Sequence, residues 1–174
     1  MTFSSDLVSN ARILIGRSPH VVRRVTELHA KYYQQQWGFG EYFGAKVASE
    51  MSGFMDRYDE LRDRVWCATI NNRIEGSITI DGIDAEGAGA HLRWFITSSA
   101  VRGQGIGGRL VDEAMNFCWE RGYPRVYLWT FRGLESARHL YEKAGFTLVE
   151  TLPGTQWGTK VDEQRYEVSL TQDV

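Results

Sequence analysis

The stretch Val101–Leu110, VRGQGIGGRL, decides how this sequence is interpreted. Glycines at positions 103, 105, 107 and 108 let the backbone approach a ligand without Cβ clashes. The stretch lies between a predicted strand, 90–97, and a helix predicted over about 105–122. A helix N-terminus carries unpaired N–H groups and the positive end of a dipole, and Arg102 and Arg109 add positive charge. We therefore expect a phosphate cradle here; the alternative is a glycine turn with a structural helix cap.

Two other phosphate-binding motifs fit this stretch less well. Residues 103–108, GQGIGG, satisfy the dinucleotide pattern G-x-G-x-x-G, which needs an acidic residue about 20 positions later to hold the ribose. No acidic residue lies between Glu120 and Glu135, and Leu128 occupies that neighbourhood. A P-loop is excluded because no Gly-Lys-Ser/Thr follows. The sequence therefore disfavours both nucleotide-binding classes.

The hydrophobic pattern around the loop predicts a mixed α/β fold. Period-2 alternation and β-branched runs predict strands over 11–17, 65–70, 74–80, 90–97, 126–131, 146–152 and 164–170. Helical periodicity predicts helices over 19–36, about 43–61, 105–122 and 134–144. The order mixes hairpins with helical crossovers, so we expect a mixed, mostly antiparallel sheet with helices on both faces. Trp94, Trp119 and Trp129 are expected in the core.

Length, composition and charge narrow the class of protein. The 174 residues suit a single domain, 1–174, and 43% hydrophobic with 24% charged residues is typical of a folded chain. A net charge of −2 leaves no bulk charge for nucleic acid or an anionic membrane. Cys67 and Cys118 have neither zinc spacing nor a disulfide framework, which favours a reducing cytoplasm and no metal. No apolar run is long enough for a membrane span, and residues 1–10 lack a signal-peptide pattern.

Two linked motifs resemble one family. Residues 102–107, RGQGIG, resemble the R/Q-x-x-G-x-G/A loop of the GNAT superfamily of acetyl-CoA-dependent N-acyltransferases, and residues 137–146, ARHLYEKAGF, resemble that family's A-x-x-LYEKxGF helix end. The stretches LRWFI, YLWTF and PGTQWG also resemble the acetyltransferase half of bacterial proteins that fuse a MarR-type regulator to this enzyme. Over about 11–170 the resemblance implies a GNAT fold, with about seven strands, about four helices, and a sheet splayed between strands four and five.

The resemblance also implies where acetyl-CoA binds. In the family, pantetheine pairs with the fourth strand, and the glycine-loop amides hold the pyrophosphate. A backbone N–H at a bulge in that strand can polarise the thioester carbonyl. Leu134 occupies the position of a family Asn that bonds the pantetheine arm, and Ser136 is expected to replace it. Carried over, the cofactor-binding residues are Phe95, Ile96, Thr97, Arg102, Gly103, Gln104, Gly105, Ile106, Gly107, Gly108 and Ser136.

Catalytic candidates follow from the same resemblance and from residue chemistry. Tyr141 matches the tyrosine that protonates the leaving thiolate; the alternative is a packed aromatic. His91 and Arg93 share one face of their strand, as a candidate general base and a candidate partner for an acidic acceptor group. Their alternatives are a structural histidine and a sheet-surface ion pair.

The expected acceptor site is an aromatic-rich mouth formed by Trp37, Phe39 and Trp157. The alternative is that the same patch packs in a homodimer. The implied activity moves an acetyl group from acetyl-CoA to a primary amine of a small molecule or peptide, by direct attack and without metal. A non-catalytic acyl-CoA-binding sensor or scaffold is the second hypothesis.

Overall fold

One seven-stranded sheet organises the chain. The computed structural model describes residues 10–171; most of the segment examined for a signal peptide, residues 1–9, lies outside them. The sheet order is β1-β2-β3-β4-β5-β7-β6, and the β4–β5 pair is parallel whereas the other neighbours are antiparallel. Its strands are β1 (Arg12–Ile15), β2 (Arg64–Ile70), β3 (Arg73–Asp81), β4 (Ala90–Thr97), β5 (Arg125–Phe131), β6 (Thr147–Gly154) and β7 (Val161–Ser169).

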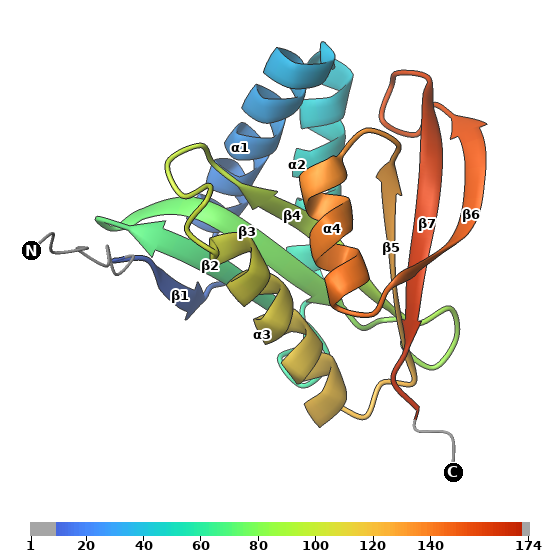
Figure 1. Cartoon of the computed structure of the whole chain (residues 1–174). Coiled ribbons are helices and arrows are strands. Elements are labelled where there is room, and N and C mark those ends of the chain that lie inside the picture. The colour runs from blue at the N-terminus through green and yellow to red at the C-terminus, as the bar shows by residue number, and fades with distance from the viewer. Residues whose placement is uncertain (1–9, 172–174) are drawn as a thin grey trace, which may run out of the picture.

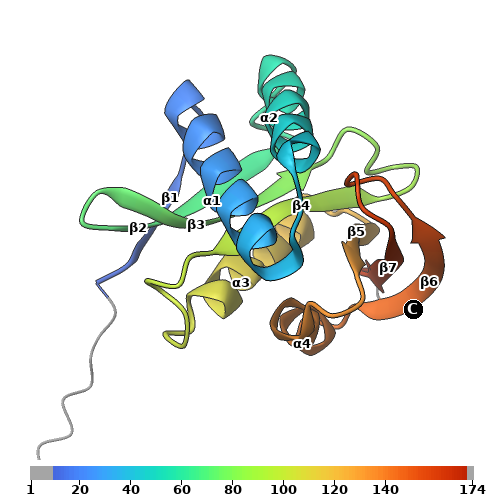
Figure 2. The same ribbon diagram turned by 90° about the horizontal axis from the view of Figure 1, so that it is seen from above.

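Four helices cover the two faces of the sheet. They are α1 (Pro19–Trp37), α2 (Glu41–Asp56), α3 (Ile106–Glu120) and α4 (Glu135–Lys143). Helices α1 and α2 lie on one face and α3 and α4 on the other (Figures 1 and 2). Each face has its own hydrophobic core: Val65 and Cys67 of β2 join the α1–α2 core, and Trp66 and Ala68, which alternate with them, join the α3 core. The predicted two-faced architecture is confirmed.

Local signals in the sequence explain several element boundaries. Ser18 caps α1, its side chain accepting a hydrogen bond from the Val21 N–H at 3.3 Å, and Pro19 begins the helix. Gly38 then ends α1 at a φ of 66°. Asn71 and Asn72 form the β2–β3 turn at φ values of 50° and 62°, a left-handed conformation that Asn tolerates.

Trp119, which was expected in the core, lies on the surface, and the second helix ends earlier than predicted. Leu61 is 68% exposed because α2 ends at Asp56 and a turn follows, in which the Arg62 N–H donates to the Asp59 carbonyl. Trp119 is 51% exposed because the buried stripe of α3 passes through Phe117 and Cys118, which leaves the next residue on the outer side. Cys67 and Cys118 are free and buried, as expected. Within residues 10–171, no helix combines the length and the apolar character that crossing a membrane requires.

The sheet is splayed between β4 and β5. Only two residue pairs join these strands, Ala90 with Val126 and His91 with Tyr127. Further along, β4 contains a bulge: Thr79 of β3 is paired with Arg93 and Ser77 with Ile96, so β4 holds one extra residue between these pairs. Trp94, inside the bulge, has a φ of 47°. The Ser77 hydroxyl donates to the Trp94 carbonyl at 3.0 Å and holds the bulge in place.

Helices α3 and α4 approach each other where α3 begins. A Cβ built at Gly107 would lie 3.0 Å from Leu140 Cδ1 and 3.4 Å from Phe95 Cζ, whereas one at Gly108 would lie 3.9 Å from Leu140 Cδ2. The missing side chain at Gly107 therefore allows the close contact between α3, α4 and β4.

Alanine at these two adjacent glycine positions should change the free energy of unfolding in opposite directions. Gly108→Ala should raise the free energy of unfolding by about 0.5 kcal/mol, because alanine favours the helix and its methyl group fits. Gly107→Ala should lower it by about 0.5 to 1 kcal/mol, because the methyl group overpacks against Leu140. Urea unfolding of both variants gives the comparison, and equal stabilisation by both would contradict the packing argument.

Candidate functional site

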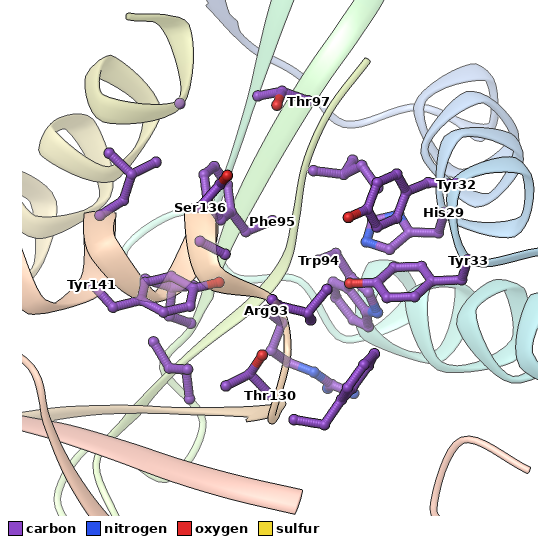
Figure 3. Close-up of a pocket in the computed structure, with 18 of the residues that line it drawn as sticks. His29, Tyr32, Tyr33, Arg93, Trp94, Phe95, Thr97, Thr130, Ser136 and Tyr141 are labelled. Carbon is purple, nitrogen blue, oxygen red and sulfur yellow. The ribbon is translucent and has the colours of Figure 1, made fainter. Parts of the chain in front are cut away.

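The space between the splayed strands is a cavity of about 850 Å³. Helices α1 and α2 border it on one side and the beginnings of α3 and α4 on the other (Figure 3). The predicted strand contacts Phe95, Ile96 and Thr97 all line it. Because β5 turns away from β4 here, the edge of β4 facing the cavity has no strand partner over these residues. A bound extended chain can therefore pair with this edge.

The glycine loop forms one end of the cavity. Gly105 is the N-cap of α3 at a φ of 75°, and the Arg109 N–H donates to its carbonyl, so the N–H groups of the first turn before Arg109 have no helical partner. The first turn contains no acidic residue and no side chain caps it. A Cβ at Gly103 or Gly105 would meet no protein atom within 4 Å. The loop thus suits an anion such as a pyrophosphate.

Nearly all the predicted cofactor residues border this cavity. The exception is Gln104, whose side chain turns back and donates from Nε2 to the Ala100 carbonyl at 3.1 Å. Arg102 borders the cavity, donates to the Thr97 carbonyl at 3.3 Å, and lies over the Tyr32 ring at 4.8 Å. Ser136 borders it from the exposed first turn of α4, beside Leu134.

Tyr141 projects from α4 into the cavity. Its side chain is buried, and its ring packs edge-on against Phe95 at 5.8 Å between centroids. The hydroxyls of Tyr141 and Tyr33 point toward the middle of the cavity from opposite sides (Figure 3). Burial, with a smaller contribution from Tyr33, raises the pKa of Tyr141 above its ordinary value, so its phenol stays protonated across the physiological range. Packing and proton donation are thus compatible at this residue.

His91 is poorly suited to the predicted role of general base. It stacks on Tyr127 at 4.4 Å, at the level where β4 and β5 still pair. Burial and, to a lesser extent, Arg93 lower its pKa to about 3. The imidazole is therefore neutral at neutral pH but a weak base, and the structure favours the structural alternative.

The four predicted acceptor residues divide into two pairs. Trp157 and Arg93 line the cavity, but Trp37 and Phe39 do not. Phe39 is buried in the α1–α2 core, and the Trp37 ring packs against Gly133, where a Cβ would lie 2.3 Å away. The turn between α1 and α2 packs both rings against Phe131. The distance to the centroid of the Phe131 ring is 5.5 Å from Phe39 and 4.8 Å from Trp37.

Arg93 forms ion pairs with two carboxylates. One terminal nitrogen lies 3.0 Å from Glu50 Oε2 and the other 3.3 Å from Asp81 Oδ2. Lys46 pairs with the second oxygen of Glu50. The ion-pair alternative is therefore the one observed, and Arg93 is not a free binding site for an acidic group.

Sequence reasoning missed the residues that α1 and α2 contribute. Helical spacing places Tyr32 in the packing of the first helix, Tyr33 falls at the aromatic junction of the first two helices, and Lys46 and Glu50 belong to no motif. Helical periodicity shows which face is apolar but not that the sheet beneath it opens, so no local signal marked these four residues. All four line the cavity.

His29 was also missed, and it lines the cavity from α1. Its Nδ1–H donates to the Val25 carbonyl at 2.8 Å, which fixes the tautomer and leaves the lone pair on Nε2. The side chain is 4% exposed, and burial lowers its pKa to about 4 in spite of that hydrogen bond. His29 thus places a neutral hydrogen-bond acceptor among aromatic rings. Among residues 10–171, no cluster of three or more His, Cys, Asp or Glu side chains could hold a metal ion.

The sequence pattern of the acetyltransferase (GNAT) family matches residues 22–146. The chain belongs to this family, and the predicted GNAT fold is confirmed. No match was found among curated proteins.

Solved structures share the whole fold at low sequence identity. An acetyltransferase of the GNAT family from Staphylococcus aureus Mu50 has a TM-score of 0.73 and 19% identity, covering 92% of this chain and 99% of that one. An N-acetyltransferase from the same strain has a TM-score of 0.72 and 16% identity, covering 94% and 100%. YncA from Salmonella typhimurium, solved with its cofactor acetyl-CoA, has a TM-score of 0.73 and 14% identity, covering 95% and 97%.

The lowered pKa of His29 predicts a sensitivity to acid. Between pH 6.5 and about 4 the unfolded chain binds a proton at this residue and the folded chain does not, so stability falls as the pH falls. His29→Gln should remove about 2 kcal/mol of the stability loss between pH 7 and pH 4.5. Carboxylates that titrate in this range contribute to both proteins and cancel in the difference. Equal pH dependence of chemical unfolding in the two proteins would mean that His29 is not desolvated.

Proposed function

We propose that this protein transfers the acetyl group of acetyl-CoA to a primary amine by direct attack. One observation carries the proposal: the anion-binding loop, the unpaired edge of β4 and the phenol of Tyr141 border a single cavity in a chain of the acetyltransferase family. YncA, which shares the fold, was solved with acetyl-CoA. The resemblance to the acetyltransferase half of MarR-type fusion proteins remains a prediction.

The residues present fit coenzyme A, which supplies the activated acetyl thioester. The first-turn N–H groups of α3 and the charge of Arg102 would hold the pyrophosphate. The backbone of Phe95, Ile96 and Thr97 would pair with the pantetheine arm, and a backbone N–H at the Trp94 bulge would polarise the thioester carbonyl. Leu134 offers no polar group for the arm, so Ser136, which lines the same stretch of the cavity, would take that contact.

The transfer step needs one proton donor and one proton acceptor. The amine nitrogen bonds to the carbonyl carbon, the C–S bond breaks, and the electron pair leaves on sulfur. Tyr141 donates its proton to that sulfur, and the nitrogen loses one proton, which restores the phenol through solvent. With its lowered pKa His29 is, like His91, a weak base, so the proton passes to solvent. Its Nδ1–H is fixed on Val25 and its Nε2 lone pair has no protein partner among the described residues, so His29 can accept a hydrogen bond from the attacking amine.

Loss of the phenol tests the catalytic assignment. Tyr141→Phe should fold normally, bind acetyl-CoA with little change, and lose about 10²-fold in turnover, the usual size of general acid assistance. Because the pKa of Tyr141 is raised, we also expect that ionisation of this phenol does not cause any loss of wild-type turnover that occurs below pH 10. The matched control is Tyr166→Phe, which removes a neighbouring buried hydroxyl that does not line the cavity.

Each outcome of this test has a definite meaning. Wild-type turnover in Tyr141→Phe would show that the ring only packs. If wild-type protein binds acetyl-CoA but releases no thiol with any amine, the sensor or scaffold hypothesis replaces the enzyme.

A charge placed in the loop tests the pyrophosphate site. Gly105 has a positive φ, so a valine there would strain the backbone, whereas aspartate tolerates this conformation. Gly105→Asp should weaken acetyl-CoA binding at least about tenfold, because its carboxylate occupies the anion's position at the helix N-terminus. Gly122→Asp is the matched control: Gly122 also has a positive φ and open surroundings, and it lies beyond the other end of α3, a helix about 22 Å long. Calorimetric titration with acetyl-CoA should separate the two variants, and equal affinities would place the anion elsewhere.

A further inference from the structure

The acceptor end of the cavity is lined by α1, α2, the bulge of β4 and the β6–β7 loop. Its side chains indicate which class of acceptor can bind there. We propose that the acceptor is a primary amine on a flat aromatic body without a carboxylate, an arylalkylamine. The proposal rests on the proposed function and deepens it. It follows from two features of the acceptor end: its cations are already paired with carboxylates, and much of its remaining wall is aromatic.

The charges at the acceptor end form a closed cluster. Arg93 contacts Glu50 at 3.0 Å and Asp81 at 3.3 Å through different terminal nitrogens, and Lys46 contacts the other oxygen of Glu50. Arg57 also pairs with Asp81, so each of the two carboxylates is shared by two cations and no cation of the cluster lacks a carboxylate partner. A carboxylate of an amino-acid acceptor would have to displace Glu50 or Asp81 to reach Arg93, and the extra ammonium groups of a polyamine would find Glu50 already paired twice.

Further contacts of Asp81 stabilise its ion pair with Arg93. It is 3% exposed and is also held by Arg57, whose terminal nitrogen donates to Asp81 Oδ1 at 3.0 Å. Although burial alone would raise the pKa of Asp81, its hydrogen bond with Arg57 and the charges of Arg57 and Arg93 bring the pKa below its usual value. The carboxylate thus stays ionised and keeps Arg93 paired. The face of Arg93 itself stacks on Trp94, with the guanidinium carbon 4.1 Å from the ring centroid.

The one cavity-lining cation without a carboxylate partner among the described residues is in the other half. Arg102 belongs to the glycine loop and contacts Thr97 and the Tyr32 ring. In the proposed function this charge faces the pyrophosphate. It therefore adds no free anion site at the acceptor end.

Aromatic rings form much of the rest of the acceptor end, beside Val47, Thr130 and Gln156. Tyr33, Phe131 and Trp157 make a continuous wall, with centroid separations of 5.9 Å from Tyr33 to Phe131 and 5.5 Å from Phe131 to Trp157. Trp94 and Tyr33 enter the same space in Figure 3. Such walls accept a flat ring by stacked or edge-on contacts. His29 supplies an uncharged acceptor for the N–H of a neutral amine among these rings.

Two probes that differ by a single carboxylate test this inference. 2-Phenylethylamine and L-phenylalanine share the ring, the two-carbon chain and the amine. With wild-type protein and acetyl-CoA, thiol release should give a kcat/KM at least about 100-fold higher for 2-phenylethylamine, because the carboxylate of phenylalanine would be buried without a free cation to pair with. Spermidine, tested in parallel, should be as poor as phenylalanine.

A variant that frees Arg93 tests the cause. Glu50→Gln removes one carboxylate partner of both Arg93 and Lys46. It should raise kcat/KM for phenylalanine about tenfold and change that for 2-phenylethylamine less, because the substrate carboxylate then takes the place of Glu50. Asp112→Asn on α3 is the control: it removes one negative charge from a residue that does not line this cavity.

The outcomes separate the inference from the proposed function. Phenylalanine or spermidine turned over as well as 2-phenylethylamine would overturn the acceptor class and leave the acetyltransferase proposal intact. If no amine releases thiol, the proposed function fails, and the acceptor class is judged by binding instead. Quenching of tryptophan fluorescence in the presence of coenzyme A should then still show tighter binding of 2-phenylethylamine than of phenylalanine; equal binding would overturn the inference.

Discussion

The early separation of β4 from β5 is the constraint on which the rest of the site depends. Two parallel residue pairs hold the strands together at one end, and the bulge at Trp94 then turns the edge of β4 away from β5. Backbone groups left unpaired in this way need other partners. The same separation makes room for Tyr141 from one face of the sheet and Tyr33 from the other. A continuously paired sheet would have neither a cavity nor an unpaired edge.

The two halves of the cavity differ in whether their positive groups are paired with carboxylates. At the glycine loop, the first turn of α3 contains no acidic residue and Arg102 forms no ion pair with a described residue, so the backbone N–H groups and Arg102 leave positive potential. At the acceptor end, Lys46 and Arg93 are both paired with the carboxylates of Glu50 and Asp81. One end of the cavity is thus prepared for an anion, whereas the other has its cations paired and is lined largely by aromatic rings. This division favours a polyanionic donor and an acceptor that has little charge beyond its amine.

Residues whose role depends on local chemistry were predictable. Ser18 and Pro19 fixed the start of α1, and Asn71 and Asn72 fixed a hairpin turn, because capping and left-handed backbone act within a few residues. The glycine loop followed the same logic. Trp119 and Leu61 were misplaced because hydrophobicity alone does not say where a helix ends or which way its stripe turns. Trp37 and Phe39 were assigned to the site on composition, but the turn between α1 and α2 directs them behind Phe131.

The sequence by itself determined the order of strands and helices, the two hydrophobic faces, the anion-binding loop and the family resemblance, because all of these are written in short-range patterns and contiguous motifs. Only the tertiary structure decided which side chains share the cavity. His29, Glu50 and Arg93 are far apart in the chain and meet because α1 and α2 pack over the bulged strand. Whether Arg93 is free or paired depends on Asp81 and Glu50, and the basicity of His91 and His29 depends on burial. These are properties of distance and solvent exclusion, which no local pattern of residues encodes.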